Sequence, residues 1–90
     1  MKRVHLIVKG RVQGVGYRAK TRRLASQFDI KGYVKNLPDG RVEVVAEGND
    51  KNIDKFVLEC KRGSFVARVD EVKESYSEPT NEFDEFEIEF

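Results

Sequence analysis

The nine residues GRVQGVGYR, from Gly10 to Arg18, have the composition of a binding site for a phosphate-sized anion. Gly10, Gly14 and Gly16 admit backbone dihedral angles that other residues avoid, so successive backbone N–H groups can turn inward as an anion-binding nest. A helical pattern follows, and the first N–H groups of a helix have no partner within it. Arg18 lies in that first turn, where a cation is disfavoured by about 0.3 to 1 kcal/mol. A bound anion reverses this preference, because a guanidinium adds two charge-assisted hydrogen bonds to those of the backbone.

Two familiar phosphate-binding motifs do not account for this stretch. GVGYRA, from Gly14 to Ala19, fits the G-x-G-x-x-A variant of the dinucleotide fingerprint, but that fold needs a parallel strand followed by another crossover helix. Here the second predicted strand turns back through LPDG, and 90 residues leave no room for the other half-site. A Walker loop is also excluded, because no Gly-Lys-Ser or Gly-Lys-Thr follows the glycines.

The sequence around the glycines limits the chemistry that such a cradle could perform. No Asp or Glu lies between Met1 and Phe28, so the loop has no neighbouring carboxylate base or metal ligand. His5 and Cys60 are interpreted as an ordinary strand residue and a packed core thiol. An acyl phosphate suits this inventory, because its leaving group is a carboxylate of pKa about 4 that needs no general acid. Its hydrolysis requires a stabilised phosphoryl group and an oriented water, which the uncharged amide of Asn36 could hold.

Local pattern alone leaves an alternative open for both polar side chains. Arg18 could be a solvated surface arginine whose side chain extends into water. Asn36, at the end of a predicted strand, could be a routine strand-end residue that bonds nearby backbone. The glycines favour the phosphate-binding interpretation of Arg18.

The periodicity of the apolar residues predicts a strand, helix, strand, strand, helix, strand order with a strand-like tail. The predicted strands cover 3–9, 32–36, 41–47, 67–76 and 86–90; the predicted helices run from Tyr17 to about Phe28, ending before Gly32, and from a cap at Asn49 or Asp50 to a stop at Gly63. The turn LPDG joins the middle two strands as a hairpin. This order is typical of the ferredoxin-like split βαβ sandwich (βαββαβ), an α+β fold with a mainly antiparallel sheet and two helices on one face. We expect residues 1–90 to form a single domain.

Composition and charge bound the setting in which the protein works. No window approaches the roughly 18 apolar residues of a membrane span, and the N-terminal residues do not resemble a signal peptide. A single cysteine, Cys60, permits no internal disulfide and excludes a structural zinc site on ligand count, so we expect a cytoplasmic protein. The charges are segregated: Met1–Arg41 carries 11 Lys or Arg against two acids, and Val42–Phe90 carries six against 14. The basic half is the expected home of an anion, unless the two halves simply neutralise each other.

GRVQGVGYR and GYVKNLPDGRVEVVAEG, taken together, resemble the two signature segments of the acylphosphatase family, and the predicted element order matches along essentially the whole chain. The resemblance implies cofactor-free hydrolysis of a carboxyl-phosphate bond to a carboxylate and inorganic phosphate. It assigns the catalytic arginine to Arg18 and the catalytic asparagine to Asn36. It also assigns the phosphate-binding loop to Gln13, Gly14, Val15, Gly16 and Tyr17.

This chain departs from the family pattern beside the loop. Tyr17 stands where phenylalanine is common, which should be tolerated if its hydroxyl reaches water or a polar partner. Ala19 and Lys20 stand where many relatives carry an aromatic residue, a change expected to affect packing or the fit of the acyl group rather than the reaction.

Two other classes of function remain open from the sequence. The chain could be a non-catalytic module that binds phosphate or carbamoyl phosphate, although both catalytic positions are filled. It could also be an RNA-binding domain, although the predicted strands lack the aromatic cluster that stacks bases. The favoured interpretation needs no metal, cofactor, nucleic acid or membrane. Its partners are a small-molecule acyl phosphate and inorganic phosphate, and we expect it to be a monomer.

Overall fold

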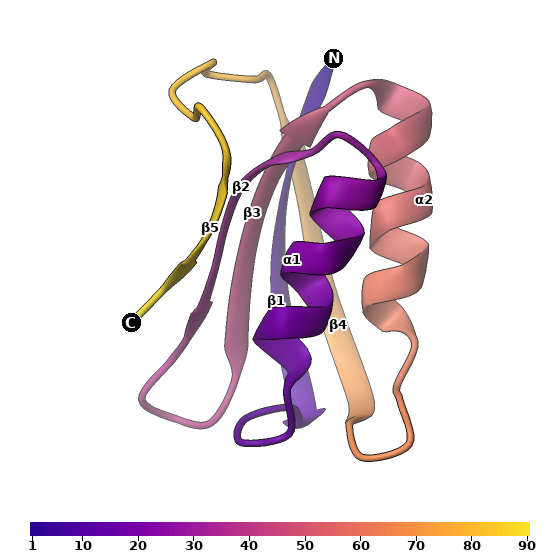
Figure 1. Cartoon of the computed structure of the whole chain (residues 1–90), viewed down its shortest axis with the longest axis vertical. Coiled ribbons are helices and arrows are strands. Elements are labelled where there is room, and N and C mark those ends of the chain that lie inside the picture. The colour runs from indigo at the N-terminus through magenta and orange to yellow at the C-terminus, as the bar shows by residue number, and fades with distance from the viewer.

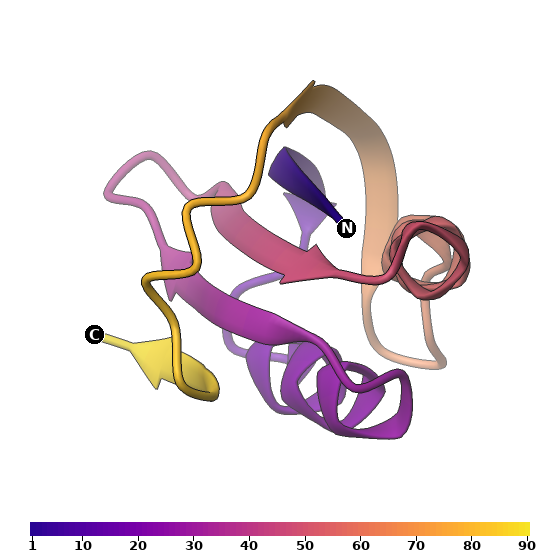
Figure 2. The ribbon, with the colours of Figure 1, turned by 90° about the horizontal axis from the view of Figure 1, so that it is seen from above.

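The secondary-structure elements follow the predicted order, and the computed structural model describes all residues from 1 to 90 (Figure 1). The elements are β1 (Lys2–Arg11), α1 (Tyr17–Gln27), β2 (Lys31–Asn36), β3 (Val42–Gly48), α2 (Asp50–Lys61), β4 (Arg68–Ser77) and β5 (Phe86–Glu89). The strands form one sheet in the order β4-β1-β3-β2-β5, in which only the β2–β5 pair is parallel. Both helices cover the same face of the sheet (Figures 1 and 2), which confirms the predicted ferredoxin-like α+β fold. Neither helix is both long and apolar enough to cross a membrane.

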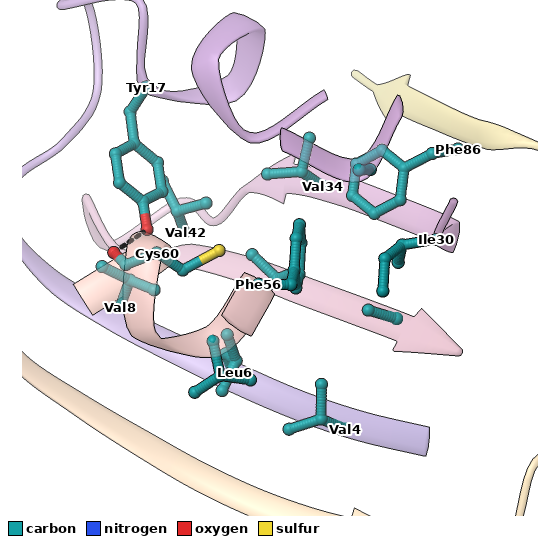
Figure 3. Close-up of a cluster of buried hydrophobic side chains, with 14 of the residues drawn as sticks. Val4, Leu6, Val8, Tyr17, Ile30, Val34, Val42, Phe56, Cys60 and Phe86 are labelled. Atoms are coloured by element: carbon teal, nitrogen blue, oxygen red, sulfur yellow. Dashed lines mark hydrogen bonds between the residues drawn. The ribbon is translucent and has the colours of Figure 1, made fainter. Parts of the chain in front are cut away.

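The hydrophobic core lies between the sheet and the two helices (Figure 3). Alternate residues of β1 point into it, because successive side chains of a strand face opposite sides of the sheet. Val4, Leu6 and Val8 are fully buried, and their partners on β3 are also apolar. Helix α2 contributes a face of four buried residues, Ile53, Phe56, Val57 and Cys60. Burial raises the pKa of the Cys60 thiol to about 12, so this cysteine is a packed core residue, as the sequence indicated.

The glycines that follow the two helices, Gly32 and Gly63, lie where other segments approach closely. Helix α1 ends through Asp29, whose φ of 55° is left-handed, and the Ile30 N–H closes the end by donating to the Ala25 carbonyl at 2.8 Å. Gly32 instead lies inside β2, where an added Cβ would sit 1.9 Å from the Val45 carbonyl oxygen. Gly63 follows α2 without a positive φ, and there a Cβ would sit 2.6 Å from the carbonyl oxygen of Ala67. Both helices end close to the predicted positions, α1 before Gly32 and α2 before Gly63, but Gly63 does not adopt the left-handed conformation of a helix-stopping glycine.

Gly10 marks an irregularity in the pairing of β1 with β4. The register shifts between Lys9 and Gly10, so that Lys9 pairs with Glu71 but Gly10 pairs with Val69, which leaves Asp70 as an extra residue on β4. A Cβ at Gly10 would lie 2.1 Å from the Arg68 carbonyl oxygen. Gly10 is thus required by the close approach of β4, and it lies within β1 rather than in the anion-binding loop to which the sequence assigned it.

A buried carboxylate, Glu47, holds the connection that carries the chain from β4 to β5. This connection crosses from one edge of the sheet to the other (Figure 2). Glu47 is only 4% exposed, and it accepts hydrogen bonds from the backbone N–H groups of Thr80 (2.9 Å) and Asn81 (3.0 Å) and from Arg3 Nη1 (2.7 Å). Burial alone raises the pKa of a carboxyl group, but here the hydrogen bonds from Thr80 and Arg3 outweigh it and hold the pKa of Glu47 below that of a free glutamate.

Tyr17, the first residue of α1, ties this helix to the last turn of α2. Its hydroxyl is buried and donates a hydrogen bond of 2.7 Å to the Cys60 carbonyl oxygen (Figure 3). Lys20 donates to the Arg62 carbonyl oxygen at 2.9 Å, at the same end of α2. A cation and a hydroxyl at this position satisfy carbonyl groups that a helix leaves free at its C-terminus. The hydroxyl of Tyr17 therefore has the polar partner that the sequence analysis required of it.

Replacing Glu47 with glutamine should destabilise the protein by about 1.5 to 3 kcal/mol, the usual worth of hydrogen bonds to a charged group. Because the folded-state pKa of Glu47 is lowered, its stabilisation is complete above the unfolded-state pKa and disappears as the pH falls through the folded-state pKa. Urea unfolding between pH 7 and pH 3 should show that the difference between wild type and Glu47→Gln narrows below about pH 4.5. Glu82→Gln is the control, because Glu82 also contacts Arg3 and Thr80 but is exposed. An equal effect of both variants would contradict the role of Glu47.

Tyr17→Phe should lower the free energy of unfolding by about 1 kcal/mol, because it leaves the Cys60 carbonyl group without a donor. Tyr76→Phe should have little effect, since the Tyr76 hydroxyl donates to Glu74 at the surface. Chemical denaturation of the two variants beside wild type measures both changes. A Tyr17→Phe variant as stable as wild type would show that the hydroxyl does not anchor α1.

Candidate active site

The loop between β1 and α1 presents backbone N–H groups that no protein atom satisfies. Gly14 and Gly16 have left-handed φ values of 73° and 79°, and Gly16 is the N-cap of α1. None of the intramolecular hydrogen bonds uses the N–H of Gln13, Gly14, Val15 or Gly16. The first turn of α1 follows directly, and its N–H groups lack intrahelical partners. Left-handed turns and a helix N-terminus together form an anion-binding nest, which we call the cradle (13–19).

Arg18 lies in the first turn of α1 and forms none of the ion pairs of the protein. Its Nη1 donates to the Glu89 carbonyl oxygen at 3.3 Å, and its guanidinium lies over the Phe90 ring, 4.9 Å from the ring centroid. The first turn contains no acidic residue. Most of the donors of this guanidinium are therefore available to an anion in the cradle.

Asn36 is the last residue of β2, and its backbone pairs with Val42 of β3. Its side-chain oxygen, Oδ1, is buried and has no hydrogen-bond partner in the protein. Leaving a buried acceptor unpaired costs about 1 to 3 kcal/mol, so a polar ligand such as water is the expected occupant of this position. The alternative of a routine strand-end asparagine that bonds nearby backbone does not apply to Oδ1.

Gln13 connects the cradle to the turn that follows Asn36. Its side-chain amide donates to the carbonyl oxygens of Leu37 at 2.8 Å and Arg41 at 2.9 Å. Sequence reasoning placed Gln13 in the phosphate-binding loop but gave its side chain no separate role. The only sign of this role in the sequence is that a side chain with two N–H donors lies inside a glycine-rich loop. Its hydrogen-bond partners are more than 20 residues away along the chain.

A hollow of about 190 Å³ adjoins the cradle. Its lining residues are Val12, Gly14, Gly16, Tyr17, Arg18, Ala19, Ile88 and Phe90. The structure thus gathers four of the predicted site residues around one concave surface and adds Ile88 of β5 and Phe90, which follows that strand; the sequence suggested neither. Val15 packs against the core instead, and Gln13 and Asn36 lie outside the lining; Gln13 hydrogen-bonds Leu37, the residue after Asn36. A larger hollow, about 600 Å³, is lined mostly by charged side chains of β1, β4 and the β2–β3 turn and includes none of the predicted site residues.

No carboxylate, imidazole or thiol side chain lines the hollow beside the cradle. His5 is paired with Glu43 through Nε2 at 2.8 Å and lies on β1, and Cys60 is buried in the core. Nowhere in the protein do three His, Cys, Asp or Glu side chains gather as potential metal ligands. The arrangement offers backbone N–H groups and a guanidinium to an anion, and no acidic or basic side chain that could exchange a proton at neutral pH.

Comparisons with known proteins agree on one family. The family model described as Acylphosphatase matches residues 4–88. The chain is 50% identical to an acylphosphatase of Methylococcus capsulatus, over 98% of this chain and 96% of the relative, and 46% identical to one of Syntrophus aciditrophicus, over 98% and 92%. The crystal structure of acylphosphatase from Bacillus subtilis superposes with a TM-score of 0.95 at 37% identity and covers all of both chains.

The match in sequence and structure extends over the cradle, Arg18 and Asn36, because it spans essentially the whole chain. The chain belongs to the acylphosphatase family, and it is an enzyme of that class.

Proposed function

We propose that the cradle and Arg18 hold the phosphoryl group of an acyl phosphate while Asn36 orients the water that attacks it. The observation that carries this proposal is the run of unpaired N–H groups in the cradle, followed by an arginine without an ion-pair partner. Donors fixed before the substrate arrives stabilise the charge that develops on the phosphoryl oxygens without reorganisation. Binding requires the guanidinium to leave the Glu89 carbonyl oxygen and turn toward the cradle, a rotation of a half-buried side chain.

The reaction then needs no acid or base from the protein. Water attacks phosphorus in line with the bond to the acyl oxygen, and that P–O bond breaks with its electron pair on the leaving carboxylate. Because a carboxylate of pKa about 4 is stable without a proton, no general acid is required. The Asn36 Oδ1 accepts a hydrogen bond from the water, and a phosphoryl oxygen of the substrate takes the proton that the water loses. The products are a carboxylate and inorganic phosphate.

The setting of this activity is also part of the proposal. We expect a monomer that works in the cytoplasm on small-molecule acyl phosphates, without a cofactor, metal or nucleic-acid partner. The large apolar side chains that are exposed come from several segments, namely Met1, Leu58, Phe65, Val66, Tyr76 and Phe90.

Arg18→Ala should reduce kcat/KM for benzoyl phosphate by about 10² to 10³ or more, the loss expected on removing a preorganised donor to the transition state. The assay follows benzoyl phosphate by ultraviolet absorbance, with and without a chelator, and a chelator should leave wild-type turnover unchanged. Arg23→Ala is the matched control, because Arg23 is an exposed arginine of the same helix. If Arg18→Ala and Arg23→Ala had equal activity, the role of Arg18 would be wrong. A folded wild type that binds phosphate without turnover would instead identify a phosphate-binding or carbamoyl-phosphate-binding module.

Asn36→Ala should lower kcat by about 10-fold or more while inorganic phosphate still inhibits with a similar constant, because the cradle is untouched. It should not destabilise the fold through a lost Oδ1 hydrogen bond, since that atom has no partner in the protein. Steady-state kinetics with phosphate as inhibitor, together with denaturant unfolding, measures both. Asn52→Ala on α2 controls for loss of an amide elsewhere. Full turnover in Asn36→Ala would remove Asn36 from the mechanism.

A further inference from the structure

One side chain joins the two segments that contain the proposed catalytic groups. The amide group of Gln13, in the cradle, reaches the carbonyl oxygens of Leu37 and Arg41, at the two ends of the turn after β2. A carboxamide has two N–H donors, and Gln13 uses one on each carbonyl group. Neither donor remains for phosphate, so the side chain of Gln13 cannot serve as a phosphate ligand in this arrangement.

The two carbonyl groups that Gln13 contacts also define the turn itself. The Leu37 N–H donates to the Arg41 carbonyl oxygen at 2.8 Å, and the Gly40 N–H donates to the Leu37 carbonyl oxygen at 3.2 Å. Gln13 therefore holds both ends of this turn, which begins at Leu37, the residue after Asn36. Asn36 Oδ1 has no hydrogen bond of its own that could fix its position relative to the cradle.

We propose that Gln13 is a positioning residue that sets the placement of Asn36, and hence of the attacking water, relative to the phosphoryl group in the cradle. This inference rests on the proposed role of Asn36. Its physical basis is the sensitivity of in-line attack to geometry, since a misplacement of about 1 Å can cost on the order of 10² in rate. The backbone N–H of Gln13 still belongs to the cradle, so one residue contributes to phosphate binding through its backbone and to water placement through its side chain.

Gln13→Met keeps the length of the side chain and removes both donors. It should lower kcat by about 10- to 100-fold and change the inhibition constant of inorganic phosphate by less than about threefold, because the backbone N–H groups remain. Gln27→Met, at the exposed end of α1, is the matched control and should leave kcat unchanged. If Gln13 had a purely structural role, Gln13→Met would lower the unfolding temperature but leave kcat unchanged when kcat is measured well below that temperature. That result would overturn the proposal.

Gln13→Glu adds a readout that depends on pH. At neutral pH the new carboxylate faces two carbonyl oxygens and has no hydrogen to donate to them. This raises the pKa of the carboxyl group and leaves the turn without its hydrogen bonds to residue 13. When protonated, the acid recovers one of the two donors. The kcat of Gln13→Glu relative to wild type should therefore increase as the pH falls from 7 to 5, whereas that of Gln13→Met should stay flat. Parallel profiles for the two variants would count against the proposal.

A double-mutant cycle separates the action of Gln13 through Asn36 from an independent effect. In the Asn36→Ala background, Gln13→Met should cause no further loss of kcat, because the group that it positions is already gone. Losses that multiply would show that Gln13 acts elsewhere and would overturn the inference. If Asn36→Ala alone kept full turnover, the proposed function of Asn36 would fail. If Asn36→Ala kept full turnover and Gln13→Met still lowered kcat, Gln13 would not act through Asn36, and the inference would also be overturned.

A measurement without turnover tests the inference even if wild type hydrolyses no acyl phosphate. In a ¹⁵N-labelled protein, Gln13→Met should shift the side-chain amide resonances of Asn36 and the backbone resonances of 37–41. Gln27→Met should leave both sets in place. Unchanged Asn36 resonances in Gln13→Met would overturn the proposal.

Discussion

The antiparallel pairing of β1 with β3 is the constraint on which the rest of the structure depends. Val4, Leu6 and Val8 face the helices together with their β3 partners, from Ala46 to Val42, and a slip of one residue would turn all of them toward the other face. This register brings the end of β1 beside the start of β3. The cradle follows the end of β1, and the turn after Asn36 leads into the start of β3. Both therefore lie at the same end of the sheet (Figure 1). Core packing thus decides which loops meet, and two core residues, Val12 and Tyr17, also line the hollow beside the cradle.

The segregation of charge along the sequence resolves into a spatial pattern. Every ion pair that joins the basic and acidic halves uses a group from residues 1–5, at the end of β1 that is remote from the cradle. The acidic half therefore neutralises the start of the basic half and not Arg18. The positive charge of Arg18 remains available to attract an anion, and neither the loop nor the first turn of α1 contains an acidic side chain that would repel one.

A residue of the site could be predicted from the sequence when its role depends on its immediate neighbours along the chain. Arg18 and Asn36 could be nominated from their types and places in the pattern, and the fold followed from periodicity. The sequence analysis placed Gly10 in the cradle, because a glycine needed for close approach to a distant strand looks the same as one needed for a left-handed turn. The side-chain role of Gln13 depends on a turn 24 residues later, and Glu47 appeared only as a polar position on a strand. Contacts between distant segments decided both, and no local pattern encodes them.

The bulge between β1 and β4 also bears on how copies of the protein behave toward each other. β4 is an edge of the sheet and is one of its two longest strands, with a row of backbone groups that could pair with another chain. The extra residue at the bulge interrupts that row, and the strand carries charged side chains at Arg68, Asp70, Glu71, Lys73 and Glu74. An incoming strand would meet a kinked backbone and would have to bury or match these charges. The irregularity that demands glycine at position 10 thereby protects the most exposed edge of the sheet against strand addition and aggregation.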